Sequence, residues 1–263
     1  MFAAYITRGV KAGLIAGLVF GLFIAVVANP LVAYADEANH AAADSGDGHG
    51  PGHGHERGHG AGGGHGGGER HHDTAVSMAM DRTVSVVSGG LWALMLGGVV
   101  FGVGYYFLEP AIPGRGATRS YVLALAGFGT VSGAPWLVLP PVAPGARQSL
   151  SVTTRLLLYG GMMAAGALAC LLGGVVYDRL VGSRGRAVAA VGALLPFGLL
   201  AIPAVLAPTN SVDGVLAPEL RAGLTGLFVF GQVLLWLVLA AAHARFAPTD
   251  GSRARPDPSL TAD

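Results

Sequence analysis

Residues 12–35 read AGLIAGLVFGLFIAVVANPLVAYA, a run of 24 residues without a charged side chain. A helix needs about 20 apolar residues to cross a bilayer, so this run predicts a membrane span. Five further stretches also lack Asp, Glu, Lys and Arg: residues 83–108, 120–146, 156–177, 187–212 and 222–242. The sequence therefore predicts an all-α fold, a polytopic transmembrane bundle of about six helices.

The overall composition agrees with a membrane protein. Charged residues make up 12% of the chain, against about 25% in a soluble domain. The net charge is +1 and no face gathers Lys and Arg, so we expect no nucleic-acid partner. Cys170 is the single cysteine and lies within an apolar stretch, which excludes an intrachain disulfide and favours a buried packing role. We expect a first helix over residues 1–35, a loop over 36–82, a helix bundle over 83–247 and a disordered tail over 248–263.

The first span has two features that affect its interpretation. Its last residues, Ala33-Tyr34-Ala35, resemble a signal-peptidase site, but the uncharged run is longer than a signal sequence needs, so we expect the helix to be retained. Glycines recur every four residues, at Gly9, Gly13, Gly17 and Gly21. They form a smooth face that suits close helix packing, and two copies of the chain could pair through it.

The distribution of Arg and Lys predicts the orientation. With six spans, ten of these residues fall at the termini and in the connections on the same side, and six fall on the opposite side. By the positive-inside rule both termini are cytoplasmic in the plasma membrane and the long first loop is external. The third span carries Pro135, Pro140, Pro141 and Pro144, which break a helical ladder. A broken or re-entrant third segment, with five full spans, stays open.

The loop over residues 36–82 has the composition of a metal-binding tether. Glycine supplies thirteen of the 23 residues at 46–68, so the loop should be disordered without a ligand. Imidazole is a preferred ligand of Co²⁺, Ni²⁺, Zn²⁺ and Cu²⁺, and the acidic residues of the loop attract cations. We predict that the metal ligands are the eight loop histidines, His40, His49, His53, His55, His59, His65, His71 and His72.

A protease motif also falls in this loop. Residues 55–59 read HERGH and match the H-E-x-x-H pattern of zinc proteases. That chemistry needs both histidines on one helix, and glycines at 52, 54, 58 and 60 disfavour a helix here. We therefore predict no enzyme activity and no catalytic residue.

Polar residues within the spans are candidates for an ion path, because burying them in hydrocarbon is unfavourable. The candidates are Asn29, Thr130, Ser132, Met162 and Gln232. The alternatives are gap-filling packing for Met162 and hydrogen bonds between helices for Asn29 and Gln232. Glu109, Asp178 and His243 lie at span ends, where we expect contact with headgroup water.

Four segments resemble a known family. They are VANPLV at 27–32, YYFLEP at 105–110, GFGTVSGAPW at 127–136 and TRLLLY at 154–159. With the His-rich loop, they make the chain similar over nearly its whole length to CbtA, a family of predicted cobalt transporter subunits. The resemblance implies cobalt uptake for cobalamin synthesis, with a second, small cobalt transporter subunit of a single span as partner. Many members carry a Lys-Tyr pair and an Asn where this chain has LVLPPV at 137–142, so any role of those groups cannot be transferred.

These observations favour a divalent-metal uptake permease whose external loop captures Co²⁺. The bound metal is the cargo, and we expect no prosthetic group. One alternative is a membrane-anchored sensor or buffer, in which the helices only hold the loop. Others are a nickel or zinc transporter, and efflux if the loop were cytoplasmic.

Overall fold

The computed structural model describes residues 2–35, 37, 91, 95–143, 146–213 and 216–247, and it is mostly helical. The first helix, α1 (Phe2–Phe23), continues through a π-helical turn, η1 (Ile24–Ala28), to Ala35. The second and third helical segments are η2 (Leu96–Phe101) with α4 (Gly102–Leu108), and α5 (Ala117–Phe128) with η3 (Gly129–Gly133) and α6 (Ala134–Trp136). The remaining helices are α7 (Val152–Gly192), the 3₁₀ turn η4 (Leu195–Leu200), α8 (Ala201–Leu206) and α9 (Pro218–Arg245).

Among the described residues, three helical stretches are long and apolar enough to cross a membrane: Phe2–Ala35, Val152–Leu206 and Pro218–Arg245. The middle stretch folds back on itself at Gly185, whose φ of 82° suits glycine. Beyond this turn, Gly192 lies against Val176 and Leu180, so the two limbs run antiparallel. The prediction of a helical membrane protein is confirmed, and the number of six spans stays a prediction.

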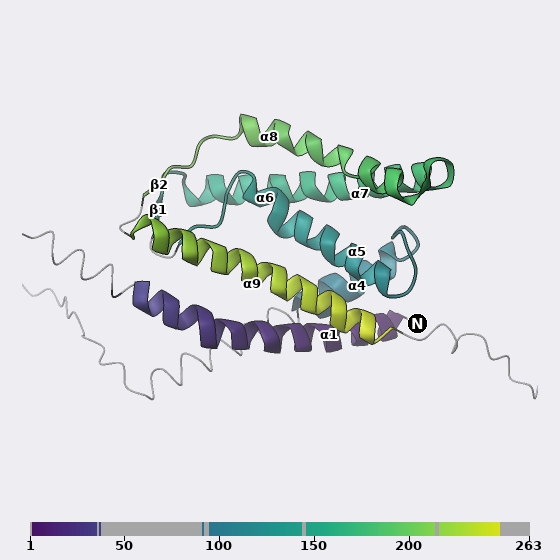
Figure 1. Ribbon diagram of the computed structural model, residues 1–263, viewed down its shortest axis with the longest axis horizontal. Helices are drawn as coiled ribbons and strands as arrows, with labels where there is room; N and C mark the ends of the chain where they lie inside the picture. Colours follow the sequence, from purple (N-terminus) through teal and green to yellow (C-terminus); the bar gives the residue numbers. More distant parts are fainter. Residues whose placement is uncertain are drawn as a thin grey trace, which may run out of the picture.

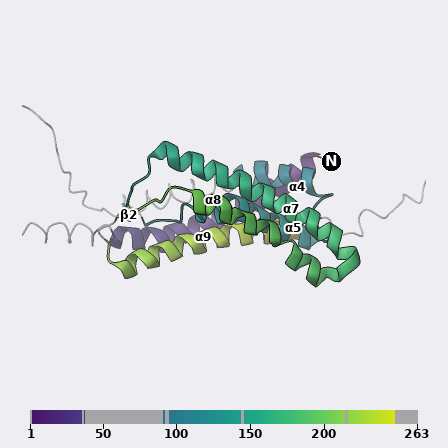
Figure 2. The ribbon, with the colours of Figure 1, turned by 90° about the horizontal axis from the view of Figure 1, so that it is seen from above.

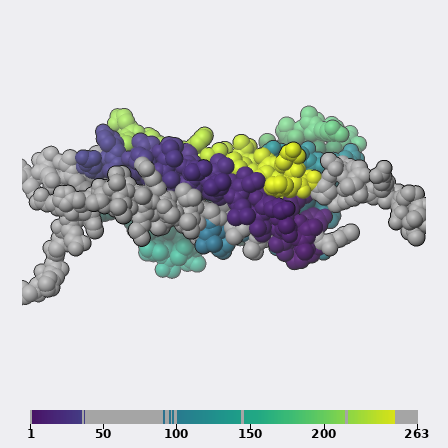
Figure 3. Space-filling view, turned by 90° about the horizontal axis from the view of Figure 1, so that it is seen from below, coloured from purple at the N-terminus to yellow at the C-terminus, as the bar shows by residue number. Residues whose placement is uncertain are grey.

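The helices lie roughly parallel or antiparallel to one another in a bundle (Figure 1). α1 and α9 run side by side in opposite directions in both ribbon views (Figures 1 and 2). α9 also contacts α5, and α7 contacts η3, α6 and η4. On the face shown in Figure 3, the N-terminal part of α1 meets the C-terminal part of α9. α9 is therefore a central helix, enclosed by α1 on one side and α5 on the other.

The two ends of the bundle differ in character. At one end, called here the N-terminal end, the start of α1 meets the start of α5 and the end of α9, with Arg8, Ser120 and His243 together. At the other, the ribbon end, strand β1 (Arg147–Gln148) pairs antiparallel with β2 (Val212–Asp213). Asn210 stabilises this two-stranded ribbon, because its Nδ2 donates a hydrogen bond to Gln148 Oε1 over 2.9 Å.

The third segment differs from the predicted span at 120–146. Its helical part starts at Ala117 and ends at Trp136, so Pro140 and Pro141 follow the helix instead of interrupting it. The chain then turns at residues 137–139 and continues without regular secondary structure to Ala143, which packs against Ala35 and Leu216. The segment thus runs from one end of the bundle to the other, in contrast to a re-entrant loop that returns to its starting side.

The glycine face of the first helix packs against other segments of the same chain. Gly9 and Gly13 contact Gly97 backbone to backbone, and Gly102 lies against Tyr5 and Gly9. Gly17 and Gly21 are also buried. The expectation of close packing through small residues is confirmed. At Gly9 and Gly13 these contacts come from the same chain, so pairing of two copies through this face is not shown and stays a prediction.

Candidate functional site

A cavity of about 450 Å³ lies between α1, η3, α9 and the start of α7. It follows the first helix from Phe20 to Val32, which corresponds to about 18 Å along the helix axis. Three of the five predicted path residues line it: Asn29, Ser132 and Gln232. They come from three different helices, so the fold gathers polar groups that lie far apart in the sequence.

The polar groups of the cavity are neutral. Ser132 is buried, and its hydroxyl donates to Gln232 Oε1 over 3.4 Å. Amide and hydroxyl oxygens can replace part of the hydration shell of a cation without trapping it as a carboxylate or imidazole set would. Among its described lining residues, none is acidic and none is a histidine. The lining thus offers neutral polar groups at a few positions among mostly apolar side chains.

Two prolines explain the shape of the helices that line this cavity. Proline lacks an N–H and its ring clashes with the carbonyl four residues earlier, so the helix widens before it. Before Pro30, the Asn29 N–H bonds to Ile24 O, five residues back, and before Pro135 the Ala134 N–H bonds to Gly129 O in the same way. π-helical turns of this kind often occur at functional sites.

Tyr159 repairs the hydrogen bonding that Pro135 disrupts. Val131 lies four residues before Pro135, so its carbonyl cannot receive the usual helical N–H from that position. The Tyr159 hydroxyl donates to Val131 O over 2.6 Å and ties α7 to η3 at the cavity wall. Tyr159 is not one of the predicted site residues, although it lies in the family-like segment 154–159.

We expect Tyr159→Phe to lower the free energy of unfolding by about 1–2 kcal/mol, because the carbonyl of Val131 loses its donor. Thermal unfolding in detergent measures the change. Tyr121→Phe is the matched control, since Tyr121 is exposed like Tyr159 but its hydroxyl makes no hydrogen bond with the described residues. Equal effects of the two substitutions would show that the Tyr159 hydroxyl does not support η3.

The other two predicted path residues lie outside the cavity lining. Thr130 Oγ1 pairs with Cys170 Sγ at 3.7 Å, on the α7 side of η3. Met162 is 3% exposed and packs with Ala134, Ala169 and Leu200 in an apolar cluster. These apolar surroundings agree with the alternative role of Met162, which is packing.

The eight predicted histidine ligands, at residues 40–72, lie outside the described residues, as does the H-E-x-x-H match. Within the described part of the chain, no group of three or more His, Cys, Asp or Glu side chains is placed to hold a metal ion. The loop ligands thus stay a prediction.

A buried polar cluster at the N-terminal end was not predicted. His243 is fully buried, which makes the expected contact with headgroup water wrong for this residue. Its Nδ1 lies 2.9 Å from Ser120 Oγ, and its backbone carbonyl accepts from Arg8 Nε over 2.7 Å. Arg8 Nη2 also donates to Ser120 Oγ over 3.3 Å. The sequence contained one indication of this cluster. Arg8 lies four and eight residues before the buried Ala12 and Ala16, so all three share one face of the helix.

A second layer of polar contacts adjoins this cluster. The Tyr5 hydroxyl donates to Glu109 Oε2, and Arg119 forms a salt bridge with Glu109 Oε1 at 3.3 Å. The Arg8 guanidinium lies 5.0 Å from the centroid of the Tyr105 ring, a cation–π contact. Glu109 therefore holds the start of α1 to the connection between α4 and α5, instead of only facing water.

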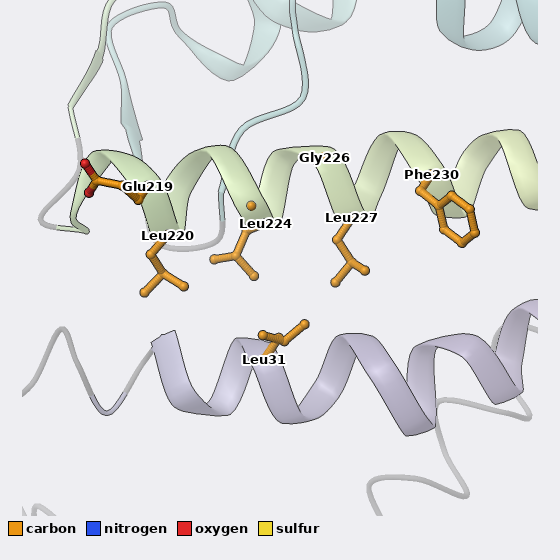
Figure 4. Close-up of a pocket in the computed structure, with 8 residues that line it drawn as sticks. Leu31, Glu219, Leu220, Leu224, Gly226, Leu227 and Phe230 are labelled. Carbon is orange, nitrogen blue, oxygen red and sulfur yellow. The ribbon is translucent and has the colours of Figure 1, made fainter.

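A groove of about 380 Å³ lies at the ribbon end between α1 and α9, with Leu31 facing Leu224 and Leu227 (Figure 4). Glu219 stands at one end of it, and its other described lining residues are apolar. The groove offers too few ligands for a metal, so the cavity with Asn29, Ser132 and Gln232 is the better candidate for an ion path.

Comparison with known proteins gives the family. The family described as "Probable cobalt transporter subunit (CbtA)" matches residues 2–248. No curated protein and no solved structure matches the chain. The match covers the apolar helices, the cavity and the N-terminal polar cluster, which agrees with a membrane-embedded subunit of a transporter. The chain belongs to the CbtA family of probable cobalt transporter subunits.

Proposed function

We propose that this chain is the permease component through which Co²⁺ enters the cell for cobalamin synthesis. The observation that carries this proposal is the cavity that gathers Asn29, Ser132 and Gln232 inside a bundle of the cobalt transporter family. The cavity extends toward the ribbon end, where Val32 and Val142 line it. An ion arriving from that side would exchange part of its water for these neutral oxygens.

The proposed orientation places the ribbon end outside. Arg8, Arg119 and Arg245 lie at the N-terminal end of the bundle, and the turn of α7 between Arg184 and Arg186 lies at the same end (Figure 1). The positive-inside rule makes this end cytoplasmic. In a plasma-membrane protein of this topology, the His-rich loop at 36–82 is external and captures the ion before it enters the cavity. Efflux would need the reverse orientation.

Two features of the transporter are proposed from the family. We propose that the partner is a small, single-span cobalt transporter subunit, and that Co²⁺ is the physiological ion. Imidazole ligands alone bind Ni²⁺, Zn²⁺ and Cu²⁺ as well, so the loop does not select the metal. The rival function is a sensor or buffer, in which metal binds to the loop and does not cross.

The test is accumulation of radiolabelled Co²⁺ in cells that express the chain with and without its partner, with Ni²⁺ and Zn²⁺ as competitors. We expect deletion of residues 46–72 to reduce uptake severalfold at low metal and to leave it near wild type at high metal, because the loop raises the local ion concentration. A full-length variant with Gln at each of the eight loop histidine positions separates ligand chemistry from loop length.

The possible results separate the permease from its rivals. Uptake that depends on the histidines at low metal supports capture followed by permeation. Metal binding by the loop without uptake at any concentration would refute the permease and favour the sensor or buffer. Uptake that is unchanged in both loop variants would refute only the capture role.

A further inference from the structure

Between the cavity and the N-terminal end, described residues of α1, α5 and α9 form a buried apolar layer. The cavity reaches no deeper along α1 than Phe20. Below it, Ala12 and Ala16 are fully buried against Leu239 and Ala240 of α9 in the main apolar cluster. Below this layer lies the Arg8 cluster. Among the described residues, the cavity thus lies in the ribbon half, and the apolar layer and the Arg8 cluster separate it from the N-terminal end.

Arg8, on α1, contacts three other helices at this end of the bundle. Its guanidinium donates to the His243 carbonyl on α9 and to Ser120 on α5, and it lies over the Tyr105 ring on α4. The His243 ring fills the space between Phe101 and Tyr105, with ring centroids 4.8 and 4.6 Å away. One charged side chain from α1 therefore holds three other segments together at a single level of the bundle.

The charge of this cluster opposes the passage of a cation. Arg8 is 9% exposed, so its charge is weakly screened by water. Glu109 is the nearby acid, and it already pairs with Arg119 and accepts from Tyr5. A divalent cation that moved past the apolar layer would meet an excess of positive charge, as at an arginine that excludes cations from a pore.

We propose that Arg8, Ser120 and His243 form the inner gate of the transporter, closed in this structure on the N-terminal side of the cavity. Opening requires Arg8 to leave both Ser120 and the His243 carbonyl, which lets α1, α5 and α9 separate and removes the positive charge from the path. His243 Nε2 is buried and has no hydrogen-bond partner among the described residues. Once Arg8 has moved, this imidazole is the first ligand of suitable chemistry for an ion leaving the cavity.

This inference rests on the proposed function for the identity of the ion, but its test does not need transport. The reporter is Ala124→Cys in a Cys170→Ala background, because Ala124 lies one turn from Ser120 on the same face of α5 and is 4% exposed. The full chain is studied in sealed vesicles with a membrane-impermeant thiol reagent. Ser183→Cys, at an exposed position near the Gly185 turn, identifies the vesicles whose N-terminal end faces the reagent.

With the gate intact, Cys at position 124 should react slowly from the N-terminal side. We expect Ser120→Ala to speed the reaction about fivefold, the effect of losing one buried hydrogen bond on an opening equilibrium. Arg8→Gln should speed it further and should also raise the passive leak of Co²⁺ from loaded vesicles. Ser149→Ala, at the ribbon end, is the control and should change neither quantity.

A purely structural role would lower thermal stability without changing access from one side. Unchanged reaction at position 124 in Ser120→Ala, with the protein monodisperse, would overturn the gate, even if Arg8→Gln fails to fold. Faster reaction without Co²⁺ flux in any variant would support the gate and refute cobalt permeation. Flux with unchanged reaction would refute the gate and leave the proposed function standing.

Discussion

Replacing Gly97 with alanine is expected to separate the first helix from η2 and to lower the free energy of unfolding by about 3 kcal/mol. A Cβ at position 97 would clash with the Cα and N of Gly13 and with the carbonyl oxygen of Gly9. These are backbone atoms, which cannot rotate away as a side chain can. The two helices must therefore move apart, which also weakens the contact between Gly9 and Gly102.

The same chain supplies a matched control for this substitution. Gly104 lies seven residues later in the same segment, and a Cβ there would meet no atom within 4 Å. Alanine favours a helix over glycine by about 1 kcal/mol, so Gly104→Ala should be neutral or slightly stabilising. Thermal unfolding of the two purified variants in one detergent measures the difference. For Gly97→Ala we expect the midpoint to fall by about 6–12 °C.

Equal midpoints for the two variants would mean that α1 and η2 are not packed backbone to backbone. A lower midpoint for Gly104→Ala alone would point to a lipid or partner contact at that position. In either case the assignment of the Gly9 and Gly13 face to contacts within the chain would be wrong, and pairing of two copies through it would become the better explanation.

The charge-free runs predicted where helices lie better than where they end. The run at 222–242 corresponds to α9, which extends to Pro218 and Arg245 because Pro is favoured in a first turn and charged residues are good helix formers. The run at 156–177 ends before Asp178, but α7 continues to the turn at Gly185. A charge marks the membrane surface, whereas a glycine with positive φ ends the helical geometry.

The site could be predicted only in part, for geometric reasons. Thr130 and Ser132 are two residues apart on a helix, so they face different neighbours, and the sequence does not say which one faces the cavity. The π-helical turn before Pro135 also changes which side of the helix each residue faces. Arg8 and His243 lie outside the apolar runs, and their burial depends on α5 and α4, which lie far away in the sequence.

We expect Gln232→Leu to reduce Co²⁺ uptake about tenfold, which corresponds to about 1.4 kcal/mol of lost stabilisation along the path. Gln232 and Ser132 provide paired oxygens in the cavity wall, and leucine removes one of them while keeping a similar volume. Without that oxygen, a cation in the cavity loses a substitute for its hydration shell. The free energy of unfolding should fall by only about 1 kcal/mol, because the hydrogen bond lost from Ser132 is long, at 3.4 Å, and leucine suits apolar neighbours such as Phe23 and Trp136.

The controls for this prediction are Thr130→Val and Met162→Leu. Thr130 carries a hydroxyl and Met162 a thioether, and both residues lie outside the cavity lining. They should transport Co²⁺ at near wild-type rates, measured as initial uptake per amount of protein in the membrane. A loss with Thr130→Val but not with Gln232→Leu would move the path to the α7 side of η3, where Cys170 lies. If neither Thr130→Val nor Gln232→Leu reduces Co²⁺ uptake, the ion does not cross through the cavity. A path there would need its polar groups, because apolar side chains cannot replace the water around a divalent ion.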